Sequence, residues 1–168
     1  MTVFRTHYIA DVKKARTPVQ RAVLSHAKRD FFCVSDQLQV QEVITMLKAS
    51  PLFSSSVHVI ALINDRAEYQ GLVSISRLLC ADKTQPVTAL VQGANHYTFA
   101  LSEAYPAALQ LRKSQWPVLP ILDSRHRVVG VLELNAARAI IRHQLELNDQ
   151  GVAKISSGWK RFVRFWKH

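Results

Sequence analysis

The sequence predicts an α+β fold built from two copies of one unit, followed by a C-terminal amphipathic helix. Within each copy the expected order is strand, helix, strand, strand, helix. The 168 residues are 48% hydrophobic and 20% charged, a mixture that buries a core of ordinary size. A unit of about 55–65 residues is too small to cover both faces of its own sheet. The two copies should therefore pack as one body with pseudo-twofold symmetry.

Each copy opens on an apolar segment that contains a proline. Residues 17–23 (TPVQRAV) are similar to residues 85–91 (QPVTALV), and a polar link leads from each to an aromatic segment at 31–34 or 97–101. Self-similarity of this kind within one chain indicates a repeated structural unit.

A helix is expected after each aromatic segment. In the first copy, apolar residues at the helical spacing i, i+3, i+4 and i+7 form one stripe, made of Val40, Val43, Ile44 and Leu47. In the second copy Pro106 stands near the helix start, where its missing N–H does little harm. The apolar residues that follow it are Ala108, Leu109 and Leu111.

Two strands joined by a polar turn come next, and their spacing matches between the copies without a gap. The matching strand, turn and strand segments are 61–64, 65–68 and 69–73 in the first copy, and 120–123, 124–127 and 128–132 in the second. Asn64 and Asp123 each close the first strand of the pair. Their side chains can accept hydrogen bonds from the backbone just ahead, which favours a turn.

A second helix closes each copy. We expect it at residues 75–81, with Leu78 and Leu79 inward, and at residues 134–145, where the inward residues are Ala137, Ile141 and Leu145. The first copy also has an additional loop at 48–57, expected on the surface. The chain thus divides into an N-terminal segment 1–16, a first unit 17–84, a second unit 85–150 and a basic aromatic C-terminal helix 151–168.

Nothing in the residues points to catalysis or to a metal site. No Gly-x-Ser-x-Gly, P-loop or dinucleotide fingerprint occurs, so we expect no enzyme. The seven histidines lack metal-ligand spacing, and the twelve acidic residues are scattered, with only turn-like or helix-surface pairs. Cys33 and Cys80 lie in apolar runs and are expected to be buried, reduced thiols.

The order of elements, the strand at 120–123 and the glycine seven residues after Asp123 resemble the paired cystathionine β-synthase (CBS) domain, or Bateman module, over residues 17–144. Residues 71–87 are similar to the join between the two CBS units of MgtE-type magnesium transporters. The resemblance implies a non-enzymatic, cytosolic regulatory homodimer that gates ion transport by changing its packing. The alternative is a stand-alone CBS regulator that binds an adenine nucleotide in the cleft between the domains.

Nucleotide-binding CBS units carry a glycine, two apolar residues, a Ser or Thr, two further residues and an Asp, whose hydroxyl and carboxylate hold a ribose. Here Ser74 has the hydroxyl position and Arg77 the acidic one, and the second copy has Glu133 and Ala136 there. Losing a carboxylate that accepts two hydrogen bonds predicts adenine-nucleotide dissociation constants above about 100 μM. The candidate nucleotide-binding residues are Ala61, Ser74, Arg77, Pro120 and Glu133.

Two interpretations of Ser74 and Arg77 stay open. They hold a nucleotide, with Arg77 paired to phosphate, or they are a helix N-cap and a solvated charge. The resemblance leaves Mg²⁺ and an adenine nucleotide as the candidate ligands, both expected to bind weakly. A magnesium sensor needs clustered carboxylates, which the sequence does not bring together.

The charge of +10 favours anionic partners such as lipid, nucleotide phosphate or nucleic acid. Nucleic-acid binding has no recognised reading element here and is the least favoured. No stretch has the length of a membrane span or the core of a signal peptide, so we expect a soluble, cytoplasmic chain that is not exported.

The C-terminal stretch has its own pattern. An apolar face with helical spacing contains Trp159, Phe162, Val163 and Trp166, and the cations beside it are Lys160, Arg161, Arg164 and Lys167. Trp and cationic residues together suit an anionic membrane surface, and the alternative is a helix packed on the core. The MgtE resemblance implies a connecting helix that leads to a transmembrane pore domain, so the membrane-facing or pore-facing interpretation is preferred, at the inner face of the cell membrane.

Overall fold

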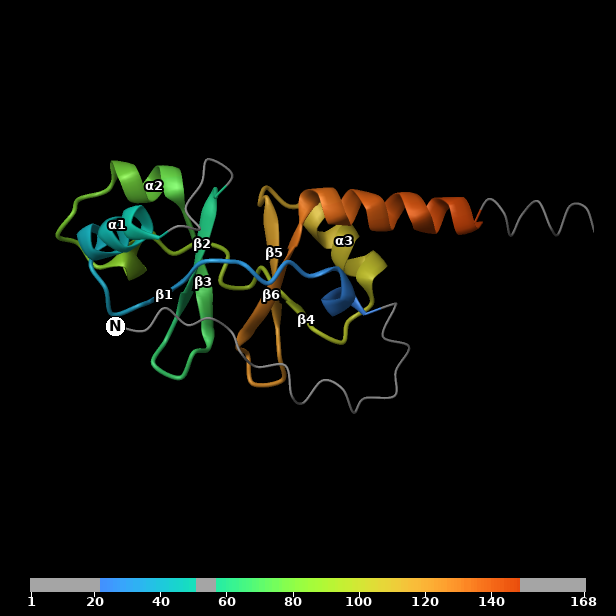
Figure 1. Cartoon of the computed structure of the whole chain (residues 1–168), viewed down its shortest axis with the longest axis horizontal. Coiled ribbons are helices and arrows are strands. Elements are labelled where there is room, and N and C mark those ends of the chain that lie inside the picture. The colour runs from blue at the N-terminus through green and yellow to red at the C-terminus, as the bar shows by residue number, and fades with distance from the viewer. Residues whose placement is uncertain (1–21, 51–56, 149–168) are drawn as a thin grey trace, which may run out of the picture.

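The computed structural model of the chain describes residues 22–50 and 57–148. Its strands form two three-stranded sheets that lie face to face, with helices on their outer sides (Figure 1). One sheet contains β1 (Cys33–Ser35), β2 (Val59–Ile63) and β3 (Tyr69–Ser74), and the other contains β4 (Thr98–Phe99), β5 (Val118–Leu122) and β6 (Val128–Glu133). In each sheet the first pair of strands is parallel and the second antiparallel. The predicted duplication is confirmed, because residues 61–63 and 120–122 have equivalent places on β2 and β5, and Asn64 and Asp123 directly follow these strands.

The predicted helices form where the apolar stripes lie. α1 (Val40–Ala49) buries all four residues of its stripe, and Glu42 closes its N-terminus by accepting from the Gln39 amide at 2.8 Å. α3 (Ala104–Lys113) has Pro106 in its first turn, as expected. α2 (Ile75–Cys80) and a helix at residues 134–148 close the two copies.

Three burial predictions are wrong. Leu79 is 60% exposed because α2 is only six residues long and turns a single residue, Leu78, into the core. Cys80 ends the same helix and is exposed. Leu145 is 52% exposed because the helix at 134–148 runs past the body that it packs on (Figure 1). Most of the additional loop, residues 51–56, lies outside the described residues.

The predicted alignment of the opening segments is wrong by four residues. Two short 3-10 helices occupy equivalent places, η3 (Val23–His26) and η4 (Val87–Leu90). Val23 and Val87 are both fully buried, so Val23 is the counterpart of Val87. The similarity of the two Pro-Val pairs had suggested Val19 instead. Similarity over a few residues is a weaker guide to structural equivalence than burial of the side chains.

The opening segment of each copy packs against the other copy. Val23 belongs to the core of α3, β5 and β6, and its amide donates to Ser102 O at 2.8 Å. Val87 and Leu90 belong to the core of α1, β2 and β3. We therefore call β1, α1, β2, β3, α2 and η4 the first lobe, and η3, β4, α3, β5, β6 and the helix at 134–148 the second lobe.

Two linkers cross between the lobes as a result. Lys28 pairs with Val131 of β6 through two backbone hydrogen bonds of 2.9 Å, and Gln92 pairs with Leu72 of β3 through two of 2.8 Å. Between the sheets a third apolar cluster joins the lobes and contains Ala61, Ile63, Tyr69, Leu72, Leu122 and Val128. Each crossing linker thus completes the edge of the sheet that it leaves.

The turns between the paired strands form as predicted. Asn64 Oδ1 accepts from the Arg66 and Glu68 amides at 3.0 and 2.9 Å, and Asp123 Oδ1 accepts from the Arg125 and Arg127 amides, both at 2.9 Å. Asp123 Oδ2 also accepts from the Arg127 guanidinium at 2.6 and 2.8 Å. Partial burial opposes ionisation of Asp123, but the hydrogen bonds and charge of Arg127 and the Arg125 amide outweigh it and lower the pKa of the carboxyl.

Asp123→Asn should destabilise the protein by about 1 kcal/mol at pH 7, since the amide keeps the turn bonds, as Asn64 does, and loses the ion pair. A lowered folded-state pKa stabilises the protein above the unfolded pKa near 4, and this stabilisation is lost as pH falls. The difference from wild type should therefore shrink between about pH 5 and pH 2. Urea unfolding across that range measures it, with the exposed Asp65→Asn as control. A difference that is independent of pH would contradict the prediction.

Candidate functional site

Two pockets open in the cleft between the lobes. They share Val57 and His58 just before β2, Val59 at its start, and Pro117 just before β5. The first, here the Glu133 pocket, has a volume of about 260 Å³ and is lined by Lys28, Phe31, Phe32, Val118, Val131 and Glu133 in addition. The second, here the Ser74 pocket, has a volume of about 830 Å³ and is lined further by Ser74, Ser76, Leu79, Gln92, Gln115 and Trp116.

The duplication makes the two pockets equivalent in position. Ser74 is the last residue of β3 and Glu133 is the last residue of β6. Gln92 and Lys28 lie on the crossing linkers. Gln92 pairs with Leu72, two residues before Ser74 on β3, and Lys28 pairs with Val131, two residues before Glu133 on β6. Each pocket therefore combines the end of one lobe's last strand with the linker that leaves that lobe.

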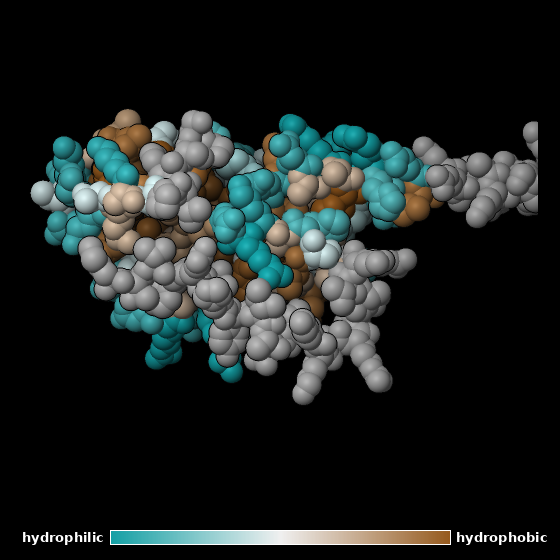
Figure 2. All heavy atoms as spheres, viewed as in Figure 1, coloured by the Kyte–Doolittle hydropathy of each residue, from teal (hydrophilic) through white to brown (hydrophobic). Residues whose placement is uncertain are grey.

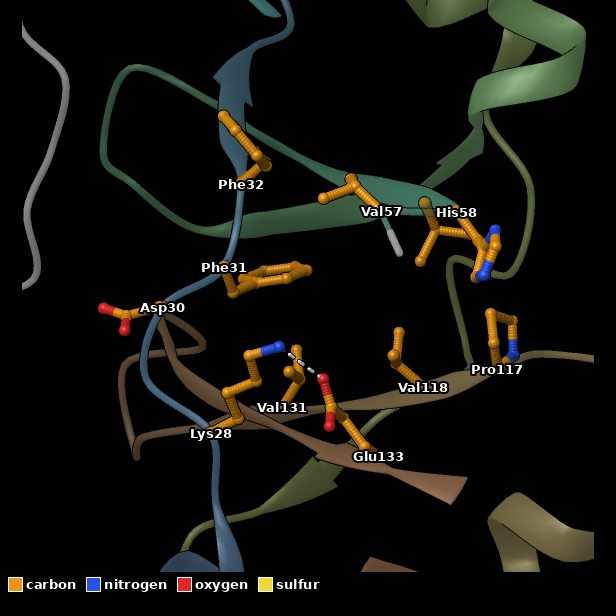
Figure 3. A pocket seen from close by; sticks show the side chains of 11 residues that line it. Lys28, Asp30, Phe31, Phe32, Val57, His58, Pro117, Val118, Val131 and Glu133 are labelled. Atoms are coloured by element: carbon orange, nitrogen blue, oxygen red, sulfur yellow. Dashed lines mark hydrogen bonds and ion pairs between the residues drawn. The ribbon is translucent and has the colours of Figure 1, made fainter. Parts of the chain in front are cut away.

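An ion pair lies at the edge of the Glu133 pocket. Lys28 Nζ is 2.7 Å from Glu133 Oε1, and the two side chains are 49% and 43% exposed. The Phe31 ring points into the space between them and His58, whereas Asp30 points away (Figure 3). Apolar side chains from both lobes form the rest of the wall. The pocket therefore offers a flat apolar surface beside a neutralised pair of charges.

The Ser74 pocket has different chemistry. Of the residues that the structure describes, no Asp, Glu, Lys or Arg lines it. Ser74 Oγ accepts from the Arg77 amide at 3.2 Å, which caps α2, and lies 2.7 Å from Ser76 Oγ. The hydroxyls, the two glutamine amides and the Trp116 ring offer uncharged hydrogen-bonding and stacking groups to a ligand.

The linker beside the Ser74 pocket is held by aromatic residues. The Trp116 ring lies so close to Gly93 that a Cβ there would be 3.2 Å from it, and the His96 ring stacks on Trp116 with centroids 6.1 Å apart. His96 Nε2 donates to Val118 O at 3.0 Å, and Tyr69 Oη donates to Gly93 O at 3.0 Å. Burial lowers the pKa of His96 although the Val118 bond opposes the shift, and burial raises the pKa of Tyr69.

The five predicted nucleotide-binding residues do not all meet in the cleft. Ser74 and Glu133 line the two pockets. Ala61 and Pro120 are buried within β2 and β5, and Arg77 is exposed on α2, and none of the three lines either pocket. Ser74 forms the helix cap of the second interpretation. Residues 159–167, which the sequence predicts to face a membrane or pore, lie outside the described residues.

Several lining residues were not predicted from the sequence. Lys28, Phe31 and Gln92 come from the crossing linkers, and Trp116 from the segment before β5. A signal for them existed, because residues 28 and 92 have the same place relative to α1 and α3. It could be recognised only with the corrected alignment of the opening segments.

Neither a metal-binding cluster nor a membrane span is found within residues 22–50 and 57–148. No group of three or more His, Cys, Asp or Glu side chains within these residues is arranged to hold a metal ion. No helix in this part of the chain combines the length and the apolar character needed to cross a membrane. Burial raises the pKa of the Cys33 thiol to about 12, so at neutral pH it is protonated.

The two sheets, the exchanged opening segments and the paired clefts define the fold of a CBS-domain pair, and the resemblance read from the sequence is confirmed at that level. The CBS pair domain of a Shewanella oneidensis protein that is proposed to transport Mg²⁺ superposes with a TM-score of 0.66, at 17% identity over 74% of this chain and 72% of that one. The cytosolic domain of the Mg²⁺ channel MgtE in complex with ATP superposes with a TM-score of 0.67, at 17% identity over 72% and 49%.

A curated protein is also similar in sequence. The magnesium transporter MgtE of Thermus thermophilus is 20% identical over 106 residues, which is 63% of this chain. The matched stretch spans about a quarter of the transporter, 24% of its length. No protein-family model matches the chain.

Proposed function

We propose that the chain is a non-catalytic regulatory CBS pair of an MgtE-like magnesium transport system, working as a homodimer on the cytoplasmic face of the membrane. The fold likeness to two magnesium-transport domains and the sequence similarity to MgtE support this role. No step of it requires chemistry from the cleft. The cleft binds a ligand, and binding favours one packing of the lobes over another.

One observation supports the coupling most directly. Glu133 lines its pocket, and the next residue begins the helix at 134–148. Ala137, Ile140 and Ile141 anchor this helix in the same core as β5 and β6. A change of lobe packing at the Glu133 pocket would therefore move this helix together with the second lobe, and the helix precedes the C-terminal segment in the chain.

The distribution of charge supports a site at an anionic surface. Residues 22–50 and 57–148 contain 12 Lys and Arg against 10 Asp and Glu. Residues 1–21 and residues 149–168 each contain five Lys and Arg against one acidic residue. The CBS pair itself is therefore close to neutral. Its surface is nevertheless hydrophilic over the upper face of the second lobe (Figure 2). The excess positive charge lies in the two terminal segments, where cytoplasmic anionic lipid would attract it.

Magnesium uptake tests the proposed role. Cells that encode the chain should lose the dependence of Mg²⁺ uptake on Mg²⁺ supply when the gene is deleted, and regain it when the gene is restored. Restoration with Gly71→Ala, which weakens the fold, should regain less. Uptake of Mg²⁺ that responds to supply as before in the deletion strain would contradict the proposal.

Vesicle binding tests the membrane location. The full chain should sediment with anionic vesicles at low salt and less at high salt, and a chain lacking residues 158–168 should bind at least tenfold more weakly. Four cations at about 1 kcal/mol each are removed. The melting temperature should change by less than about 2 °C if this segment faces lipid and not the core. A large fall in melting temperature with unchanged vesicle binding would favour the core-helix alternative. The double variant Trp159→Ala with Trp166→Ala keeps the four cations of the segment and is the control for the loss of charge.

The Ser74 pocket supports a second candidate function, a stand-alone regulator that binds an adenine nucleotide. Ser74 has the hydroxyl position of the nucleotide motif, and the pocket is large and uncharged. Such a chain would bind nucleotide without associating with a membrane, so vesicle sedimentation and nucleotide titration together distinguish the two functions.

A further inference from the structure

The two pockets share one architecture but differ in charge at matching positions. Where the Ser74 pocket has the hydroxyl of Ser74 and the amide of Gln92, the Glu133 pocket has the carboxylate of Glu133 and the ammonium of Lys28. Both exchanges replace a neutral group with an ionised one. A duplicated fold thus presents a ligand with two environments of different charge.

Backbone hydrogen bonds hold Lys28 beside β6, within reach of Glu133. Lys28 N donates to Val131 O and Val131 N donates to Lys28 O, both at 2.9 Å, so the linker cannot move away without breaking two hydrogen bonds. From this position Nζ reaches Glu133 Oε1 at 2.7 Å. The ammonium is therefore engaged by the protein's own carboxylate, and an anionic ligand would have to compete with that carboxylate for it.

We infer that Glu133 sets the charge preference of the Glu133 pocket, which accepts an uncharged ligand with a flat ring and rejects one that carries a phosphate or carboxylate group. A ring suits the wall of Phe31, Phe32, Val118 and Val131 and the volume of about 260 Å³. A phosphate would meet the Glu133 carboxylate with no net positive charge to offset it. The Ser74 pocket, without a carboxylate, does not discriminate in this way.

This inference rests on the proposed function only in taking the cleft as the ligand site, and it holds whether or not the chain serves a transporter. Adenosine and AMP are the probes, because they share the ring and the sugar and differ by the anionic phosphate. Titrations followed by amide NMR report the pockets separately. Phe31 and Val131 amides report the Glu133 pocket, and the Gln92 amide and Trp116 indole report the Ser74 pocket.

The wild-type Glu133 pocket should bind adenosine about tenfold more tightly than AMP. Glu133→Gln removes the charge with little change of shape and frees the Lys28 ammonium, so AMP should bind this pocket about tenfold more tightly than in wild type, with adenosine changed less than threefold. The expected factor is modest because both side chains are about half exposed. Ser74→Asp is the matched variant, since Asp also caps a helix. It should weaken AMP binding at the Ser74 reporters about tenfold.

The inference is overturned if Glu133→Gln does not raise the AMP affinity measured at the Phe31 and Val131 amides. It is equally overturned if neither adenosine nor AMP binds the wild-type protein or the variant. If that variant does not fold, Lys28→Met provides the opposite test, because an unpaired Glu133 should weaken AMP further and leave adenosine unchanged. If the deletion strain loses the dependence of Mg²⁺ uptake on Mg²⁺ supply but the cleft shows no charge preference, the proposed function stands and this inference is wrong. If uptake still responds to supply but the cleft shows the predicted preference, the inference stands and the proposed function is wrong.

Discussion

Val23→Asp should destabilise the protein by more than about 4 kcal/mol, because it places a carboxylate in a fully buried position with no partner for its charge. The whole free energy of unfolding of a domain is about 5–15 kcal/mol, so much of the fold should be lost. Ser25→Asp is the control. It introduces the same charge into the same 3-10 helix at an exposed position, and should cost less than about 1 kcal/mol.

The location of the damage is the sharper result. Val23 precedes β1 in the chain but packs with Ala108, Leu111, Ile121 and Leu132 of the second lobe. Hydrogen exchange should therefore show lost protection in α3, β5 and β6 before β2 and β3. Loss of protection confined to the first lobe would mean that the opening segment packs with its own copy, contrary to the structure.

Gly71→Ala should destabilise the protein by about 4 kcal/mol and lower its melting temperature by about 10 °C. Gly71 has a φ of +147°, which side chains rarely adopt. A Cβ there would also lie 2.6 Å from Val91 Cγ1 and 3.0 Å from Gln92 O. These atoms belong to the crossing linker, which is paired with β3 and has little freedom to withdraw.

Gly130→Ala is the matched control, because Gly130 has the equivalent place on β6. Its Cβ would lie 3.0 Å from both Ala27 Cβ and Lys28 O, so contact is tight, but its backbone is outside the left-handed region. We expect about half of the Gly71→Ala effect in thermal unfolding. Equal losses in the two variants would show that backbone strain at Gly71 contributes nothing.

The paired strands show which features could be predicted from local pattern. Asn64 and Asp123 sit 59 residues apart with the same turn around each, and both accept the backbone hydrogen bonds expected of them. The α1 stripe was predicted for the same reason, since its spacing allows one buried face and all its members are buried. Such signals lie within a few residues of one another, where chain geometry alone decides which side chains are neighbours.

The candidate site could be predicted only in part. Ser74 and Glu133 were predicted because the resemblance to nucleotide-binding CBS units implies that they occupy the hydroxyl position of the motif in the two copies. Lys28 and Trp116 were missed because each comes from a segment without periodicity that reaches the cleft across the pseudo-twofold axis. The contact between Lys28 and Glu133 joins residues 105 apart in the chain, and no local pattern encodes such a distance.

The sequence by itself determined the duplication, the order of elements, the turns and the family of folds, because these follow from spacing along the chain. The tertiary structure alone decided that each opening segment packs in the opposite lobe, that Leu79, Cys80 and Leu145 face outward, and that the two pockets differ in charge. The physical reason is that burial depends on what lies opposite a side chain. For Val23 the buried residues opposite it include Ala100, Leu111 and Leu132, which follow it in the chain by 77 or more positions.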